Sequence, residues 1–335
     1  DPGSWEHLYW PLAHASWHGI TITDFVYPFF IFIVGVSIIL SSSKQLDAGA
    51  DKKKMKKKIW IRSLKIFGLG ILLNLFPDFN FMELRIPGVL QRIAIVYLIC
   101  AHIGLATNWK GQVKIAVFLL VGYWLAMMLI PVPGIGAGVL EPGKNLAAWI
   151  DSVVIPLRMY QGTWDPEGLL STLPAIATGI TGMLAGQLLK QDMDIEKKLN
   201  YMFFIGFVCV LVGYSWDLVF PFNKNLWSSS FVMFTSGWAF MSFAACILIV
   251  DVHGYQKVAK FGVIYGSNAI TIYVLAGMLP VLLHGVLGVK GLFFNGLVDI
   301  GMAPKLASAL WAFLYMFICF IPAYILYKKK IFIKV

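Results

Sequence analysis

Apolar segments of about 18 residues or more recur along this chain, and they constrain its fold more than any other feature. A run of this length with few charges is typical of a helix that crosses the roughly 30 Å hydrocarbon core of a bilayer. In lipid a single span must satisfy its own backbone hydrogen bonds, which an isolated strand cannot do. The sequence therefore predicts an all-α, polytopic membrane bundle of about nine helices. Their expected ranges are 22–42, 59–76, 88–107, 113–131, 168–190, 199–220, 226–250, 262–285 and 305–327.

Composition and charge agree with a membrane protein. Of the 335 residues 59% are hydrophobic and 13% charged, and the mean hydropathy is +0.76. The net charge of +10 comes from short basic blocks beside apolar segments, such as KKKMKKK at 52–58, which is typical of topology signals rather than of nucleic-acid binding. Every second connection is basic, so the sequence predicts that this side is cytoplasmic and that the other side faces outward.

A single transmembrane domain over residues 1–335 is expected, with one long outer loop or lid at 131–167. Within that loop, residues 145–159 are expected to form a short helix on the membrane surface. The N-terminal loop lies outside in this topology, so one more helix is expected upstream of Asp1. The four cysteines lie in apolar runs and no metal-ligand spacing such as HExxH occurs, so no metal site is predicted.

Two histidines, His14 and His18, precede the first apolar segment with Trp17 between them. They suit an interfacial belt, in which amphipathic rings settle at the headgroups. They also suit chemistry, because an imidazole that titrates near neutral pH can act as a general base or acyl acceptor. Asp24 follows, and it either caps the helix with Thr21 or Thr23 or belongs to a site, because a carboxylate at the edge of lipid needs a partner.

Arg85 and Arg92 are seven residues apart, which predicts one helical face on the helix that Pro87 opens. A buried guanidinium needs an anionic or carbonyl partner. That partner is either a ligand or a structural carboxylate, Asp24 or Asp165.

Three further motifs carry polar candidates. In TWDPEGLL, Asp165 is predicted to cap a helix that has Glu167 in its first turn, and capping alone would explain both. Asn223 and Lys224 are predicted to form a polar outer turn, with an interfacial anchor as the alternative. Asn268 is expected a few residues inside the end of its helix, where such groups more often hold helices together than bind ligands.

Taken together, these segments resemble the heparan-alpha-glucosaminide N-acetyltransferase family, a group of polytopic membrane acyltransferases. The resemblance covers almost the whole chain in the expected order. Its motifs are HASWHGITITDFVYPFFIFIVGVS, LRIPGVLQRIA, GAGVLEPGKNLAAWID, TWDPEGLLSTLPAI, NKNLWSSSFV and GSNAITIYV.

The resemblance implies an acetyl-CoA-dependent N-acetyltransferase that acts on an amino sugar of the glucosamine type at the extracytoplasmic face. It implies that His14 handles the acetyl group, either as the base of a direct transfer or as its covalent carrier. It also makes the following residues candidates for lining the substrate or cofactor site: Asp24, Arg85, Arg92, Asp165, Glu167, Asn223, Lys224 and Asn268.

The alternative function is a permease for amino sugars or oligosaccharides, which would use the same buried polar groups for passage. The expected partners are acetyl-CoA, an amino-sugar or glycan acceptor and the lipid bilayer, without nucleic acid, and a homodimer stays open. The expected localisation is multi-pass in a bacterial cytoplasmic (inner) membrane.

Overall fold

The computed structural model describes residues 1–333, so the last two residues of the expected domain lie outside the described residues. Within that range the chain is helical, and its only extended pairing is an isolated bridge between Val132 and Gly136. Eight helices are long and apolar enough to cross a membrane. The predicted all-α polytopic fold is confirmed.

Contacts between Cα atoms divide the chain into two compact units. Unit 2 comprises residues 15–74 and 80–248, and unit 1 comprises residues 1–14, 75–79 and 249 onward. The single domain expected over 1–335 stays a prediction.

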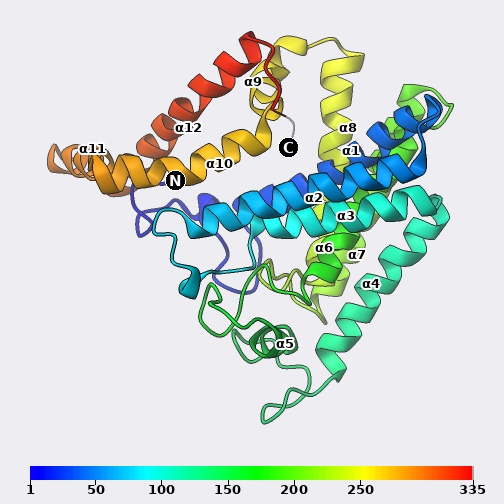
Figure 1. Ribbon diagram of the computed structural model, residues 1–335, viewed down its shortest axis with the longest axis horizontal. Helices are drawn as coiled ribbons and strands as arrows, with labels where there is room; N and C mark the ends of the chain where they lie inside the picture. The colour runs from blue at the N-terminus through cyan, green and yellow to red at the C-terminus, as the bar shows by residue number, and fades with distance from the viewer. Residues whose placement is uncertain (334–335) are drawn as a thin grey trace. The chain divides into compact units, whose positions relative to one another are not determined.

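Unit 2 contains eight α-helices, which Figure 1 colours from blue to yellow. Their bounds are α1 Val26–Asp47, α2 Lys52–Leu75, α3 Val89–Ala106, α4 Trp109–Leu129, α5 Leu146–Val154, α6 Thr172–Leu189, α7 Ile195–Asp217 and α8 Ser229–Ile247. Short 3-10 turns at Ile22–Phe25 and Phe81–Glu83 precede α1 and α3, and a π-helical turn at Leu248–Val252 follows α8.

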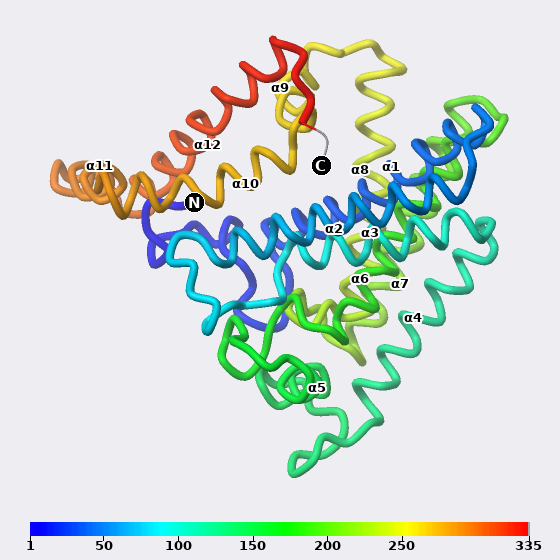
Figure 2. Tube along the Cα trace, viewed as in Figure 1, coloured from blue at the N-terminus to red at the C-terminus, as the bar shows by residue number. Residues whose placement is uncertain are grey.

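Helix α6 is the centre of unit 2, because glycines let α1 approach it closely. A Cβ atom at Gly182 would collide with the carbonyl oxygen of Phe32, and one at Gly35 would collide with that of Gly179. Small residues at a helix crossing are how membrane helices gain packing where lipid supplies no hydrophobic drive. The trace in Figure 2 shows α1 crossing the region of α6.

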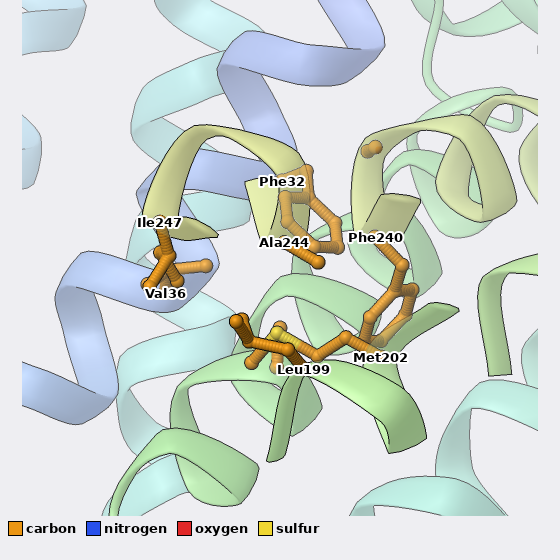
Figure 3. Close-up of a cluster of buried hydrophobic side chains, with 9 residues drawn as sticks. Phe32, Val36, Leu199, Met202, Phe240, Ala244 and Ile247 are labelled. Atoms are coloured by element: carbon orange, nitrogen blue, oxygen red, sulfur yellow. The ribbon is translucent and has the colours of Figure 1, made fainter. Parts of the chain in front are cut away.

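Next to this crossing lies a core shared by α1, α7 and α8, which Figure 3 shows in close-up. Phe32 of α1 stacks edge-to-face on Phe240 of α8, with ring centroids 5.1 Å apart. Leu199 and Met202 of α7 close the cluster from the other side. Apolar packing therefore holds the membrane-spanning helices α1, α7 and α8 together in unit 2.

The long outer loop forms a second core with the end of α4. Tyr123 and Met127 of α4 pack against Leu146 and Ala147 of α5. Asn145 caps α5 by accepting a hydrogen bond from the backbone N–H of Ala148 (3.0 Å). The predicted short helix within 145–159 is thus present, and it is packed on protein along one side.

Unit 1 departs most from the expected helices. Its bounds are α9 Gln256–Gly266, α10 Ala269–Pro280, a π-helical turn Val281–Val286, α11 Val289–Asp299, α12 Pro304–Lys328 and, near the N-terminus, a 3-10 turn Trp10–Leu12. The span expected at 262–285 is present as Ala269–Val286, but it does not continue the helix before it, because the chain breaks at Ser267 and Asn268. Helix α11 was not expected, since it is too short to register as a span.

Candidate active site

Asp24 organises the loop that carries the two histidines. Its carboxylate oxygen Oδ2 accepts hydrogen bonds from the backbone N–H of Ala15 (3.2 Å) and from both the N–H and the hydroxyl of Thr21 (3.0 Å each). Asp24 is 1% exposed. The capping expected with Thr21 is present as a capping box. The bond from the Ala15 N–H is additional to this cap, and it fixes the peptide group that joins His14 to Ala15.

The other oxygen of Asp24 faces a cation. Lys224 Nζ lies 3.6 Å from Asp24 Oδ1, and Lys224 also interacts electrostatically with Glu167. Burial lowers the pKa of Lys224, while Asp24 and Glu167 oppose that effect. Lys224 thus links the histidine loop to the segment that begins at Asp165.

Arg85 continues this chain of charges. Its Nε and Nη2 donate to the two carboxylate oxygens of Asp165 at 2.7 and 2.6 Å, and Nη2 also lies 2.5 Å from Glu167 Oε2. Burial would lower the pKa of Arg85, but these bonds and charges raise it above its usual value. The paired, charge-assisted geometry fixes the guanidinium in one orientation. Asp24, Lys224, Glu167, Arg85 and Asp165 therefore form one network.

Arg92 lies deeper and has no carboxylate among its hydrogen-bond partners. Its Nη2 donates to the Gly168 carbonyl oxygen (3.1 Å) and to Ser171 Oγ (2.5 Å), and its guanidinium stacks 5.3 Å from the centre of the Trp227 ring. Among the described residues, Nε and Nη1 of Arg92 have no hydrogen-bond acceptor. Arg92 is 1% exposed, so two donors of a buried cation remain for an oxygen-bearing group.

Trp227 is held in an unusual conformation beneath this cation. Its φ is +53°, a region that costs a bulky residue of order 1–3 kcal/mol. The indole Nε1 donates to Thr178 Oγ1 (3.0 Å), and its ring meets Tyr27 edge-to-face at 4.9 Å. Strain of this kind persists where the surrounding contacts over-determine a position, which marks Trp227 as part of the site's frame.

Asp151 connects the outer loop to the same segment. It lies on α5, is 1% exposed, and its Oδ1 accepts a hydrogen bond from the N–H of Leu169 (2.8 Å). A Cβ atom at Gly168 would collide with the Asp151 carboxylate, so only glycine permits this approach. Burial raises the pKa of Asp151 to about 6, opposed by the Leu169 N–H; Asp165 adds to the rise and Arg92 opposes it.

Two geometric expectations are wrong. Arg85 lies outside the helix, because α3 begins at Val89, so Arg85 and Arg92 do not share a helical face. Asp165 does not cap α6, which begins at Thr172. Asp165 instead shapes a turn by accepting bonds from the N–H groups of Glu167 (2.9 Å) and Tyr160 (3.0 Å). The expected Arg85–Asp165 ion pair is nevertheless present.

Asn223 serves its own turn and touches the histidine loop. Its Oδ1 accepts a bond from Leu226 N–H (2.8 Å), and its amide nitrogen lies 3.4 Å from His18 Nδ1. Gly19 N–H donates to the Phe222 carbonyl beside it (2.8 Å). The turn predicted around Asn223 and Lys224 is thus present, and it borders the histidine loop at His18 and Gly19, while its outward position stays a prediction.

Asn268 and His14 fall in unit 1. Asn268 precedes α10 at the helix break, and it bonds the backbone of Ile331 (3.0 Å) and Ile333 (2.8 Å), so its observed partners are structural. His14 is exposed and is joined to unit 2 through its peptide bond with Ala15. The catalytic role of His14 and the site roles of the other candidates stay predictions.

Sequence reasoning missed Asp151, Gly168 and Ser171 as members of this arrangement, and it placed Trp227 only in the turn with Asn223 and Lys224. An acid on an otherwise apolar short helix was the available signal for Asp151. Gly168, Ser171 and Trp227 carry no such signal, because their part depends on contacts across more than 45 residues of sequence.

The chain is similar to known proteins over the region that carries these motifs. A family model described as "Heparan-alpha-glucosaminide N-acetyltransferase, catalytic" matches residues 5–213. Two curated proteins named heparan-alpha-glucosaminide N-acetyltransferase, from Mus musculus and Homo sapiens, are each 30% identical over 394 residues. The match covers 98% of this chain and 57% and 56% of those relatives. The chain therefore spans a little more than half the length of the relatives that it matches.

Proposed function

We propose, because this chain belongs to the heparan-alpha-glucosaminide N-acetyltransferase catalytic family, that it is a membrane acetyltransferase. In this proposal it transfers the acetyl group of acetyl-CoA to the amine of an amino sugar of the glucosamine type. The name of the two relatives gives their activity on a glucosaminide, and the charged network of unit 2 supplies groups that suit a polar, amine-bearing acceptor.

His14 is the residue to which we assign the proton or acetyl transfer. In a direct transfer the neutral amine attacks the thioester carbonyl, the N–C bond forms, the C–S bond breaks, and the amine proton passes to the imidazole. In a two-step route the imidazole first takes the acetyl group and the CoA thiol leaves, after which the amine attacks the acetyl-imidazole. Both routes require a fixed imidazole.

The observation that carries this assignment is the anchoring of the histidine loop by Asp24. A carboxylate that holds the peptide N–H directly after His14 and both polar groups of Thr21 fixes the backbone from which the imidazole projects. Positioning of a catalytic group supplies a large part of enzymatic rate, and small displacements are costly. An interfacial belt residue would need no such anchor.

Arg92 fits the donor's acyl group chemically. A thioester carbonyl gains negative charge on its oxygen during transfer, and fixed donors in a water-poor setting stabilise that charge. Arg92 offers Nε and Nη1 for such an oxygen while Gly168 and Ser171 hold its remaining nitrogen. We therefore assign Arg92 to the acyl end of acetyl-CoA.

The test compares three histidine variants in purified, reconstituted protein. His14→Ala should lower acetyl transfer by about 10²-fold or more, the usual effect of losing a general base, while CoA binding persists. His18→Ala should keep much of the activity, and His253→Ala, remote in the sequence, should keep all of it. Wild-type turnover in His14→Ala would overturn the assignment, and a chain that neither binds CoA nor hydrolyses acetyl-CoA would fit the permease instead.

We further propose that donor and acceptor meet from opposite sides of the membrane. Acetyl-CoA is too highly charged to cross lipid unaided, and the positive-inside bias of the basic connections favours a cytoplasmic position for the lysine-rich side. Singly oriented proteoliposomes should acetylate glucosamine on the outer-loop side with acetyl-CoA supplied on the lysine-rich side. A requirement for both substrates on one side would contradict this arrangement.

A further inference from the structure

A groove of about 530 Å³ runs along the membrane-spanning part of unit 2, away from the charged network. Its lining residues come from α4, α6, α7 and α8, together with Gln191 just after α6. The volume lies in the range of small-molecule sites, about 300–1,000 Å³. The lining is apolar along most of its length, including Val113, Leu120, Leu184 and Met233.

The two amide side chains of the groove, Gln187 and Gln191, lie at one end, where α6 finishes. Thr181 also lines the groove, in the middle of α6, but its hydroxyl already bonds Thr178 O (2.7 Å) and Ser236 Oγ (2.9 Å). A ligand in this groove would therefore be apolar along its body and polar at its head.

Contacts of α8 set the direction of the groove. Ser229, at the start of α8, donates to the carbonyl oxygen of Leu120 (2.7 Å), and Ser236, two turns later, bonds Thr181. Along the groove, Leu120 therefore comes first, Thr181 second and Gln191 third. This order leads toward the start of α4 at Trp109. The Gln191 end is the end where α4 carries Lys110 and Lys114.

The length of the groove matches one leaflet of a bilayer. Trp109 and Leu120 both line it, and the eleven helical steps from one to the other rise about 16 Å. Half of a hydrocarbon core of about 30 Å is about 15 Å. The open rim also faces lipid, since Trp109 and Val117 are 52% and 55% exposed. An extended acyl chain meets these dimensions.

The positive charge at the polar end of the groove indicates which kind of lipid headgroup would bind there. Lys110 and Lys114 are exposed on α4, and Lys110 Nζ lies 5.6 Å from the centre of the Trp109 ring. The sequence from 84 to 140 contains no acidic residue, so these lysines have no counter-charge on their own elements. The opposite rim, from 190 to 198, mixes both signs. The α4 rim is therefore where a phosphate would be held.

We propose that this groove is a binding site for an anionic phospholipid, with one acyl chain between α4 and α7 and the phosphate at Lys110 and Lys114. The amides of Gln187 and Gln191 can donate to the glycerol ester oxygens. The pantetheine arm of CoA is the weaker occupant, because its two amides would lie against the apolar walls without partners. This site does not depend on the proposed acetyl transfer.

The test measures lipid binding to the purified, delipidated full chain by native mass spectrometry. The probes are phosphatidylglycerol and phosphatidylcholine with identical chains. Wild-type protein should bind one phosphatidylglycerol in preference to phosphatidylcholine. Each lysine near an anionic lipid contributes roughly fivefold in affinity, so Lys110→Gln with Lys114→Gln should lower that preference by about 25-fold. The matched charge control, Lys53→Gln with Lys54→Gln, should leave it unchanged.

Two filling variants test the chain-binding part. Ala116 on α4 and Cys209 on α7 both line the groove. Ala116→Phe and Cys209→Phe each place a large ring in it, and each should abolish the bound lipid. Gly122→Phe adds similar bulk to α4 in open space and should not. Equal binding of both lipids, or lipid retained in both filling variants, would overturn the proposal. Displacement of phosphatidylglycerol by CoA would overturn it as well, by assigning the groove to the donor.

Discussion

The candidate spans that contain α6 and α10 are each 18 residues long and apolar, yet they differ in how much of each is buried. The span that contains α6 is 72% buried, and the span that contains α10 is 6% buried. Their mean hydropathies, 1.3 and 1.9, run the other way, so the more apolar helix is the less buried one. In a bilayer both surfaces are equally suited to lipid, and burial is decided by how closely neighbouring helices can approach.

The polar groups of the two units also differ in what they bond to. In unit 2, carboxylates and cations from segments more than 75 residues apart pair with each other, as Arg85 does with Asp165. In unit 1, Asn268 bonds backbone groups at the end of the chain. A network of side chains specifies which segments meet, whereas a side chain bonded to backbone holds a local shape. Four predictions test or sharpen this difference.

The largest effect is expected at the α1–α6 crossing. Gly182→Val should lower the free energy of unfolding by more than the 1–3 kcal/mol, approximately, that is typical of overpacking, because the colliding group is backbone that cannot rotate away. Gly285→Val, in the turn after α10, meets open space and should change little. Unfolding in a denaturing detergent titration measures both. Equal effects at the two glycines would contradict the contrast between the helices.

Next comes the charged network. Asp165→Ala removes four hydrogen bonds and leaves Arg85 with one carboxylate, so a loss of about 2–3 kcal/mol is expected, together with reduced acetyl transfer. Asn268→Ala should lower stability by about 1–2 kcal/mol and leave transfer per folded molecule unchanged. Loss of transfer in Asn268→Ala without loss of stability would instead assign Asn268 to the site.

A smaller, pH-dependent effect is expected from Asp151. Burial raises its pKa from 3.8 to about 6, so the protonated form stabilises the fold. That contribution is complete below pH 3.8 and is lost as pH rises through about 6. Wild-type protein should therefore lose stability between pH 4.5 and 7 relative to Asp151→Asn, which cannot ionise. Asp192→Asn, at an exposed site, should show no such difference.

The smallest effect is expected where a pair of charges lies in solvent. Arg158 and Glu83 approach within 3.4 Å, but their side chains are 64% and 65% exposed. Exposed pairs contribute about 0–1 kcal/mol, so Glu83→Gln should lie within that range and become neutral at high salt. A loss comparable to that of Asp165→Ala would mean that the outer loop is held by its rim rather than by its buried groups.

The sequence by itself determined the helical class, eight of the apolar spans and the family, because lipid imposes length and hydropathy on each span separately. It also indicated candidate site residues, because ionisable residues at the edge of apolar runs are conspicuous. These candidates include Asp24, Arg85, Asp165, Glu167 and Lys224. Tertiary structure alone decided that these five charges form one network, that Arg85 lies outside α3, and that Asn268 lies in the break before α10 rather than within a helix. It also decided that Asp151 and Gly168 meet. Such pairings depend on which segments approach in space, and periodicity and hydropathy describe one segment at a time.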